Sequence, residues 1–125
     1  MSTRAQATVD VATLDKQLND QILAGDLLGA FDRFYAENVV MQENSEKPTA
    51  GKAANRKREE EFLASVEQVH GAKVLSSAAN GDVSFSEWEF DATYKGGVRV
   101  NLAQVAVRRW KNGQIANERF YYNKG

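Results

Sequence analysis

The chain lacks cysteine entirely and has a single proline and a single histidine among its 125 residues. The absence of cysteine excludes a disulfide framework, a thiolate nucleophile and a cysteine-based metal site, and one histidine alone is a poor basis for a zinc site. The sequence also lacks a run of about 18 apolar residues that could span a membrane, and its first residues lack the hydrophobic region of a signal peptide. We therefore expect a cytoplasmic protein that holds no metal or cofactor and has no membrane partner.

An excess of charge of either sign is absent too. The chain has 16 basic and 17 acidic residues, which leaves a net charge of −1. Proteins that bind nucleic acids need a clustered positive field, so we expect no nucleic-acid partner. With 42% hydrophobic residues, a chain of this length is typical of one globular domain. We place this domain at residues 10–125, after a flexible polar segment at residues 1–9.

The first half of the chain predicts three helices. The first begins near Asp10, with Asp10 or Thr8 as its cap, and the second begins at Asp26. The third runs over residues 51–69 and is highly charged. Apolar residues recur at helical spacing on one face of the first and third helices: Val11, Leu14, Leu18 and Ile22 in the first, and Phe62, Leu63 and Val66 in the third.

The rest of the pattern is that of β-strands. One strand is expected between the second and third helices, at residues 38–43, and four follow the third helix, at residues 70–79, 83–94, 98–110 and 114–122. Helices and strands are thus segregated along the chain. This order predicts an α+β fold in which three helices cover one face of a curved antiparallel or mixed sheet.

Asn112-Gly113 is the strongest turn signal in the sequence, because both residues tolerate the positive φ of a two-residue hairpin turn. Such a turn fixes the register and pairs Val107 with Glu118. Glu118 then lies on an apolar sheet face. Extended along the preceding strands, the same register places ten residues on that face: Trp88, Phe90, Ala92, Asn101, Ala103, Val105, Val107, Glu118, Phe120 and Tyr122.

A carboxylate among core residues is costly unless it is paired or has a task, and Glu118 is open to two interpretations. Burial without a partner would raise its pKa and suit it to proton transfer or to anchoring a ligand. Alternatively, Glu118 pairs with a basic residue, or accepts a hydrogen bond from Trp88 or Tyr122, for structural reasons.

Two separated groups of motifs carry a family resemblance. In the first half, Gly25-Asp26 stands between two helices, and residues 35–38, Tyr-Ala-Glu-Asn, lead into a strand. In the second half, Trp110 is followed by Gly-Gln-Ile at residues 113–115 and by Glu-Arg-Phe-Tyr-Tyr at residues 118–122. In this order and spacing, the motifs resemble the nuclear-transport-factor-2-like superfamily, most closely its SnoaL-like branch, over residues 10–123.

The resemblance implies a cone-shaped α+β barrel with an apolar pocket between the sheet and the helices, and homodimerisation through the outer sheet face. A pocket of this kind binds a small apolar ligand through aromatic walls and a few polar groups. Tyr122 and Asn101 are the polar residues expected to orient such a ligand. The expected lining consists of Trp88, Phe90, Phe120, Phe31 and Met41.

Glu43, at the end of the first predicted strand, is the second candidate base. In ketosteroid isomerase, which belongs to the same superfamily, the catalytic Asp stands where Glu43 does when the Tyr-Ala motifs are aligned. The two groups of that enzyme that stabilise the enolate fall on Leu18 and on Val105 or Ala106, which donate no side-chain hydrogen bond. The alternative is that Glu43 is a surface carboxylate at the edge of a loop.

These features predict a small-molecule pocket protein in which Glu118 or Glu43 abstracts a proton next to the carbonyl of an apolar compound, as isomerases and cyclases do. A non-catalytic ligand-binding protein and a dimeric interaction domain remain as alternatives, because this fold hosts all three. His70, the only histidine, is expected to be a half-exposed residue at the start of a strand rather than a catalyst.

Overall fold

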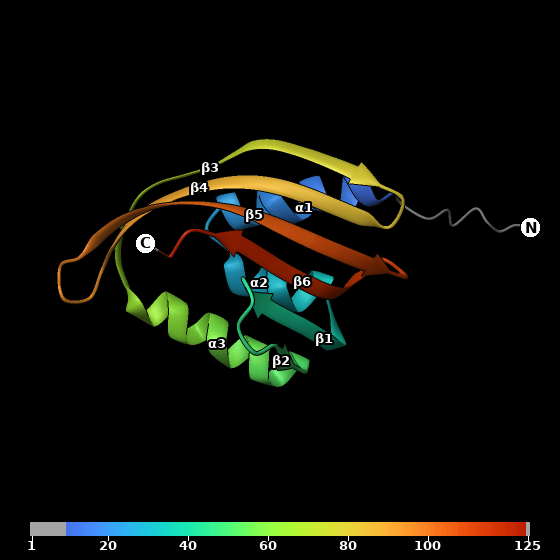
Figure 1. The fold of residues 1–125 in the computed structure, drawn as a ribbon, viewed down its shortest axis with the longest axis horizontal. Helices are drawn as coiled ribbons and strands as arrows, with labels where there is room; N and C mark the ends of the chain where they lie inside the picture. The colour runs from blue at the N-terminus through green and yellow to red at the C-terminus, as the bar shows by residue number, and fades with distance from the viewer. Residues whose placement is uncertain (1–9, 125) are drawn as a thin grey trace, which may run out of the picture.

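The computed structural model describes residues 10–124 (Figure 1). The flexible segment expected at residues 1–9 lies outside these residues. The elements follow in the order α1 (Val11–Leu23), α2 (Leu27–Phe34), β1 (Tyr35–Glu43), β2 (Thr49–Ala50), α3 (Lys52–Ser65), β3 (Val66–Asn80), β4 (Val83–Tyr94), β5 (Arg99–Lys111) and β6 (Gln114–Tyr122).

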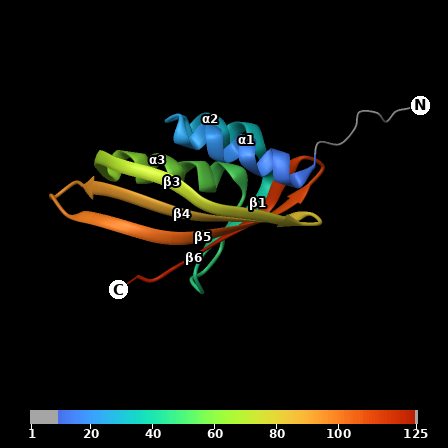
Figure 2. The same cartoon turned by 90° about the horizontal axis from the view of Figure 1, so that it is seen from above.

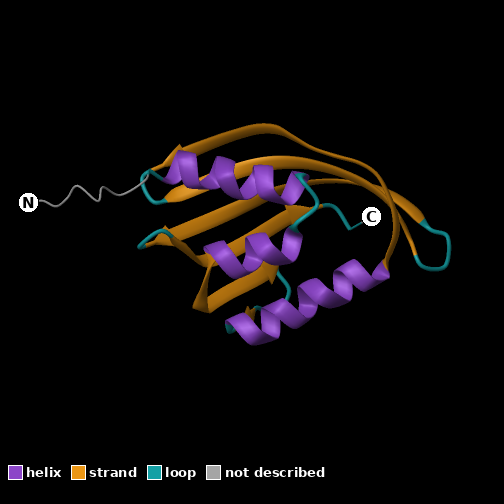
Figure 3. Cartoon of the chain, turned by 180° about the vertical axis from the view of Figure 1, so that it is seen from behind, coloured by secondary structure: helices purple, strands orange, loops and turns teal. Residues whose placement is uncertain are grey.

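The molecule has two layers, with all three helices on one face of a single sheet (Figures 2 and 3). The six strands follow the order β2-β1-β6-β5-β4-β3. β1 and β6 are parallel, whereas all other neighbours are antiparallel. The predicted α+β architecture is confirmed. The sheet is curved but not closed into a barrel, because β2 and β3 form its two edges.

Short polar side chains start the first two helices as the sequence predicts. The Asp10 carboxylate accepts a hydrogen bond from the Thr13 amide at 2.8 Å, and that of Asp26 accepts one from the Gly29 amide at 3.0 Å. α3 begins differently, since its cap Gly51 has no side chain to offer. There the buried Asn55 amide donates to the carbonyl oxygens of Gly51 and Thr49, at 2.8 and 2.9 Å, and fastens the helix to the end of β1-β2.

The third helix is shorter than the sequence predicts. It ends at Ser65, and residues 66–69, expected to be helical, open the long strand β3. Val66 has the extended backbone of a strand and pairs with Tyr94. The β-branched Val66 and Val69 favour this conformation, and pairing with β4 compensates for the lost helical turn. Leu63, expected on the buried face of the helix, is 40% exposed.

The register of the last hairpin is also different from the prediction. Lys111 pairs with Gln114 as expected, but a bulge follows Trp110–Ile115, and Glu118 pairs with Arg108 instead of Val107. An extra residue in one strand moves every later side chain of its partner to the other face. The predicted apolar face is therefore wrong for β5: Asn101, Ala103, Val105 and Val107 point away from the helices.

The main core lies between α1, α2 and the β1-β6-β5 part of the sheet. Phe31 and Tyr35 stack with ring centroids 4.6 Å apart, and Phe34 meets Trp110 edge-on at 6.1 Å. The buried cluster consists of Leu18, Ala30, Phe31, Phe34, Tyr35, Val39, Met41, Trp110 and Ile115.

No helix within residues 10–124 is long and apolar enough to cross a membrane.

Candidate functional site: carboxylates beneath helix α3

Glu118 is fully buried, as the sequence predicts, and it has two partners. Arg108 on the neighbouring strand donates through Nε to one carboxylate oxygen at 2.7 Å. The Tyr35 hydroxyl at the start of β1 donates to the other at 2.6 Å. Of the two interpretations of Glu118, the structure therefore shows the second, in which the carboxylate pairs with a basic residue. Sequence reasoning missed Arg108 as the partner, because the bulge is what turns this side chain inward.

Arg108 connects Glu118 to a second buried carboxylate, that of Asp15 on α1. The guanidinium Nη1 donates to Asp15 and to the Asn19 amide oxygen, both at 2.7 Å. Asp15 also accepts hydrogen bonds from Ser84 at 2.7 Å and Ser86 at 2.6 Å. We call the following set the buried network: Asp15, Asn19, Tyr35, Ser84, Ser86, Arg108, Trp110 and Glu118.

The carboxylates of the buried network affect the pKa values of Arg108 and Tyr35. Burial opposes the charge of Arg108, but the carboxylates of Glu118 and Asp15 outweigh this cost, and its pKa is raised. Burial, followed by the charge of Glu118, raises the pKa of Tyr35 well above its ordinary value. Tyr35 therefore stays a hydrogen-bond donor across the physiological pH range.

Glu43, the other predicted base, lies at the end of β1 and is more open. Its carboxylate accepts a hydrogen bond from the Tyr122 hydroxyl at 2.5 Å and forms an ion pair with Arg58 of α3 at 3.2 Å. The side chains of Glu43 and Arg58 are 31% and 37% exposed. Burial and the hydrogen bond to Glu43 raise the pKa of Tyr122.

Glu59 on α3 is the functional candidate that sequence reasoning missed. Burial and the negative charge of Glu118 raise its pKa to about 7; Glu43 adds to the rise and Arg58 opposes it. Within residues 10–124, Glu59 accepts no hydrogen bond and has no ion pair. Within the same range, the only side-chain polar atom that is both fully enclosed and without a partner is Asn55 Oδ1. The partnerless oxygens of Glu59 are therefore not fully enclosed and keep contact with solvent.

A sequence signal for Glu59 exists within the charged helix. Asn55 is completely buried, and Phe62 packs against Phe90 and Tyr94 of the sheet. Glu59 is four residues after Asn55 and three before Phe62, so the helical period places it on the same inward face. The surrounding run of charges favours a solvated face and hides this spacing.

The expected lining residues occupy several places. Trp88 is buried and Phe90 half-buried on the helix-facing side of β4, and Phe120 lies on the same side of β6. Phe31 and Met41 are buried in the core cluster. Whether any of them contacts a ligand stays a prediction.

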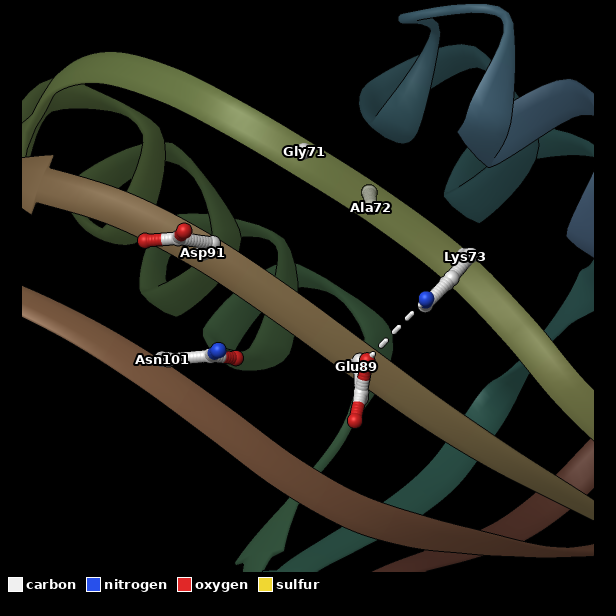
Figure 4. Close-up of a pocket in the computed structure, with 6 residues that line it drawn as sticks. All are labelled: Gly71, Ala72, Lys73, Glu89, Asp91 and Asn101. Atoms are coloured by element: carbon white, nitrogen blue, oxygen red, sulfur yellow. Dashed lines mark ion pairs between the residues drawn. The ribbon is translucent and has the colours of Figure 1, made fainter.

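Asn101, expected as a polar handle of the pocket, lies elsewhere. It pairs with Asp91 on the face of β5 turned away from the helices and borders an open hollow of about 340 Å³ (Figure 4). Lys73 and Glu89 border the same hollow and form an ion pair at 3.5 Å. His70 is exposed in β3, with Nε2 2.7 Å from the Thr93 hydroxyl oxygen. Neither Asn101 nor His70 joins the carboxylates beneath α3.

We call Glu43, Arg58, Glu59 and Tyr122 the α3 site. It combines an unpartnered carboxylate that titrates near neutral pH with a phenol and a guanidinium, both hydrogen-bond donors, around a second carboxylate. A group with a pKa near the working pH is best placed to take up and return a proton. The arrangement is therefore chemically suited to general acid–base work at a partly open position.

Comparison with known proteins gives the family. Residues 15–122 match the model of the SnoaL-like domain. A structure from Mesorhizobium loti, provisionally named a SnoaL-like polyketide cyclase [carbohydrate phosphatase], is 31% identical, with a TM-score of 0.83 over 91% of this chain and 100% of that one. The chain therefore belongs to the SnoaL-like family. No match was found among curated proteins.

More distant structures share the fold. A Pseudomonas putida protein, provisionally named a polyketide cyclase, is 23% identical, with a TM-score of 0.75 over 94% of both chains. A Catenulispora acidiphila protein with a ketosteroid-isomerase-like fold, solved in complex with trimethylamine, is 15% identical, with a TM-score of 0.74 over 89% of this chain and 85% of that one. At these identities, the likeness concerns the fold alone.

Proposed function

We propose that this protein is an acid–base catalyst that abstracts a proton next to the carbonyl of a small apolar compound, with Glu59 as the base. The observation that carries the proposal is the half-buried Glu59 carboxylate of α3, which has no hydrogen-bond or ion-pair partner within residues 10–124 and whose pKa is raised by burial and by the charges of Glu118 and Glu43. Glu118 and Glu43 were the bases expected from the sequence. Both belong to ion pairs, so we assign them electrostatic roles around Glu59.

The proposed step is enolisation. The Glu59 carboxylate takes a proton from the carbon next to the carbonyl, and the electron pair of the broken C–H bond moves to the carbonyl oxygen, which gives an enolate. In a substrate whose C=C bond begins next to the deprotonated carbon, protonated Glu59 can return the proton at the far end of that bond, which is an isomerisation. Alternatively, the enolate carbon attacks a second carbonyl and the resulting alkoxide takes the proton from Glu59, which is an aldol cyclisation. The cyclisation agrees with the polyketide cyclase part of the name of the M. loti relative.

Stabilisation of the enolate oxygen must come from donors other than those of ketosteroid isomerase. Leu18 is a core residue here, and neither Val105 nor Ala106 carries a donor. Tyr122 and Arg58 are the donors of the α3 site, where both now bind Glu43. We propose that a substrate carbonyl oxygen accepts hydrogen bonds from these two groups, which would lower the barrier to enolate formation.

The test is solvent hydrogen exchange with a probe ketone. The protein is incubated in D₂O with 2-tetralone, an apolar bicyclic ketone, and deuterium incorporation next to the carbonyl is followed by NMR. We expect Glu59→Gln to slow the protein-dependent rate by about 10²–10⁴-fold, the range of a single general base. Glu61→Gln removes an exposed carboxylate from the same helix and should leave the rate unchanged. Equal rates for the two variants would refute the proposal.

A second function is favoured by the sheet face turned away from the helices. Phe85 and Tyr121 are 38% and 44% exposed there, beside the half-buried Val105 and Val107. We propose that this face joins two copies in a homodimer, as the family resemblance implies. Sedimentation analysis of the wild type and of Tyr121→Glu tests this directly. A monomeric wild type at micromolar concentration would rule out the dimer, and a dimer unaffected by Tyr121→Glu would place it on another face.

A further inference from the structure

The buried network begins on helix α1 and ends at Glu118 on β6, beside the β1 strand on which α3 packs. Helices α1 and α3 lie at opposite ends of the helical layer (Figure 3). The connection has three charged members in a row. Asp15 binds Nη1 of Arg108, and Nε of the same guanidinium binds Glu118, at 2.7 Å in each case. All three side chains are at most 3% exposed, so water screens their charges little.

The two carboxylates of this row are held to different degrees. Asp15 accepts hydrogen bonds from Ser84, Ser86, Asn19 and Arg108. Glu118 accepts only two, from Arg108 and Tyr35, among residues 10–124. Because Arg108 divides its single positive charge between two carboxylates, the row carries a net charge of −1. Glu118 is the member of the row whose charge raises the pKa of Glu59.

We propose that Asp15 and Arg108 are positioning residues that hold Glu118 as a fixed negative charge beside Glu59, so that α1 helps to set the electrostatic environment of the α3 site. The inference rests on the proposed role of Glu59 as the base. A charge held by an arginine, a tyrosine hydroxyl and β-sheet backbone cannot move away from Glu59, as an exposed carboxylate would. The buried network then tunes a proton-transfer group without touching the substrate.

The charges that act on the pKa of Glu59 come from several elements. Glu118 comes from β6, Glu43 from β1 and Arg58 from α3 itself. Arg108 and Tyr35 stand behind Glu118, and each is bonded directly to its carboxylate. Only Glu118 is joined to α1, through Arg108 and Asp15. Substitutions along this row therefore test the proposal without altering Glu43 or Arg58.

The experiment is an NMR titration of the full-length protein labelled with ¹³C at the Glu side-chain carboxyl carbons, with Glu59 assigned from Glu59→Gln. In Glu118→Gln, the neighbouring negative charge is lost while Arg108 keeps Asp15 as a counter-ion. We expect the titration midpoint of Glu59 to fall from about 7 towards the ordinary Glu value of about 4.3. Asp15→Asn leaves Arg108 and Glu118 as a neutral pair and should move the midpoint in the same direction by less.

Asp20→Asn is the matched control, because Asp20 is an exposed carboxylate of the same helix that pairs with Lys16. It should leave Glu59 unchanged. A midpoint in Glu118→Gln that stays at the wild-type value would overturn the proposal and leave the buried network a purely structural feature. If Glu118→Gln does not fold, Asp15→Asn decides, since only a midpoint below that of Asp20→Asn agrees with the proposal.

The titration needs no substrate and so separates two failures. If Glu118→Gln shifts the Glu59 midpoint but Glu59→Gln does not slow 2-tetralone exchange, the positioning role is retained and the proposed function is refuted. If Glu59→Gln slows the exchange but Glu118→Gln leaves the Glu59 midpoint unchanged, the function is retained and the positioning role is refuted. If Arg108 acts through its charge, Arg108→Lys should retain more of the wild-type midpoint than Arg108→Gln does.

Discussion

The buried network and the α3 site use the same kind of side chain under opposite conditions. Within residues 10–124, both carboxylates of the buried network have charged and neutral donors. In the α3 site, Glu43 has two donors at a half-exposed position, and Glu59 has none. Burial and the charge of Glu118 raise the pKa of Glu59, which lacks such donors, to about 7.

The difference separates stability from chemistry within one small domain. A buried ion pair contributes little net stability, but the loss of one member leaves an uncompensated charge. The buried network should therefore respond strongly to single substitutions. A half-buried, unpartnered acid should respond mainly through pH. The following predictions measure this contrast.

The largest effect is expected from removal of the shared cation. Arg108→Met leaves the carboxylates of Asp15 and Glu118 buried without their counter-ion, and should lower the free energy of unfolding by about 3–5 kcal/mol. Arg109→Met, at the exposed neighbouring position, should change it by less than about 0.5 kcal/mol. Urea denaturation of both variants provides the comparison. Similar losses would contradict the special status of the buried network.

The α3 site should show itself in the pH dependence of stability. Folded Glu59 keeps its proton up to about pH 7, whereas the unfolded chain loses it near pH 4.3. Between these values the folded state binds more protons, so rising pH weakens folding, by up to about 4 kcal/mol above pH 7.

Denaturation of the wild type and of Glu59→Gln at pH 5 and pH 8 checks this sign. The other carboxylates titrate in both proteins, so their contribution cancels in the difference between them. Glu59→Gln should gain stability relative to the wild type on going from pH 5 to pH 8, while Glu61→Gln should follow the wild type. The prediction is wrong if the free energy of unfolding of the wild type rises relative to that of Glu59→Gln between pH 5 and pH 8.

The two tyrosines offer a direct comparison of the regions, because each donates one hydrogen bond to a glutamate. Tyr35→Phe removes a buried donor from a charged group, and should cost about 1.5–3 kcal/mol. Tyr122→Phe removes a half-buried one, and water can replace the lost donor at Glu43. We expect a cost below about 1 kcal/mol, measured by the same urea denaturation. Equal costs would mean that the α3 site is as closed as the buried network.

The sequence predicted the regular features of this fold better than the irregular ones. Asp10 and Asp26 cap helices as expected, and all four antiparallel strands of the second half are present. These features depend on local signals, which are short polar caps, alternation and the Asn112-Gly113 turn. The β-bulge carries no comparable signal, since no glycine or proline marks Ala116 as an extra residue.

One missed bulge changed the interpretation of the site. It turns Arg108 inward, which supplies Glu118 with a partner and removes Asn101 from the helix-facing side. Trp88 was still placed correctly, on the same sheet face as Glu118. The β4-β5 register, in which Thr93 pairs with Arg99, also differs by one residue from the predicted one, and this second shift cancels the first. Only the side chains of β5 therefore lie on the face opposite to the predicted one. Glu59 was missed for a different reason, since its burial depends on how closely α3 approaches the sheet.

The smallest predicted effect tests the α3 site from its positive side. Arg58 is the only group within the described residues that lowers the pKa of Glu59, opposing Glu118 and Glu43. In Arg58→Met, the Glu59 midpoint should rise above its wild-type value by less than about one unit, the reverse of the shift expected for Glu118→Gln. Because Arg58 is a third exposed, the change in stability should stay below about 1 kcal/mol. Lys57→Met removes the adjacent exposed charge, and in the same ¹³C titration it should leave the Glu59 midpoint unchanged. A midpoint in Arg58→Met no higher than that of Lys57→Met would contradict an electrostatic effect of Arg58 on Glu59.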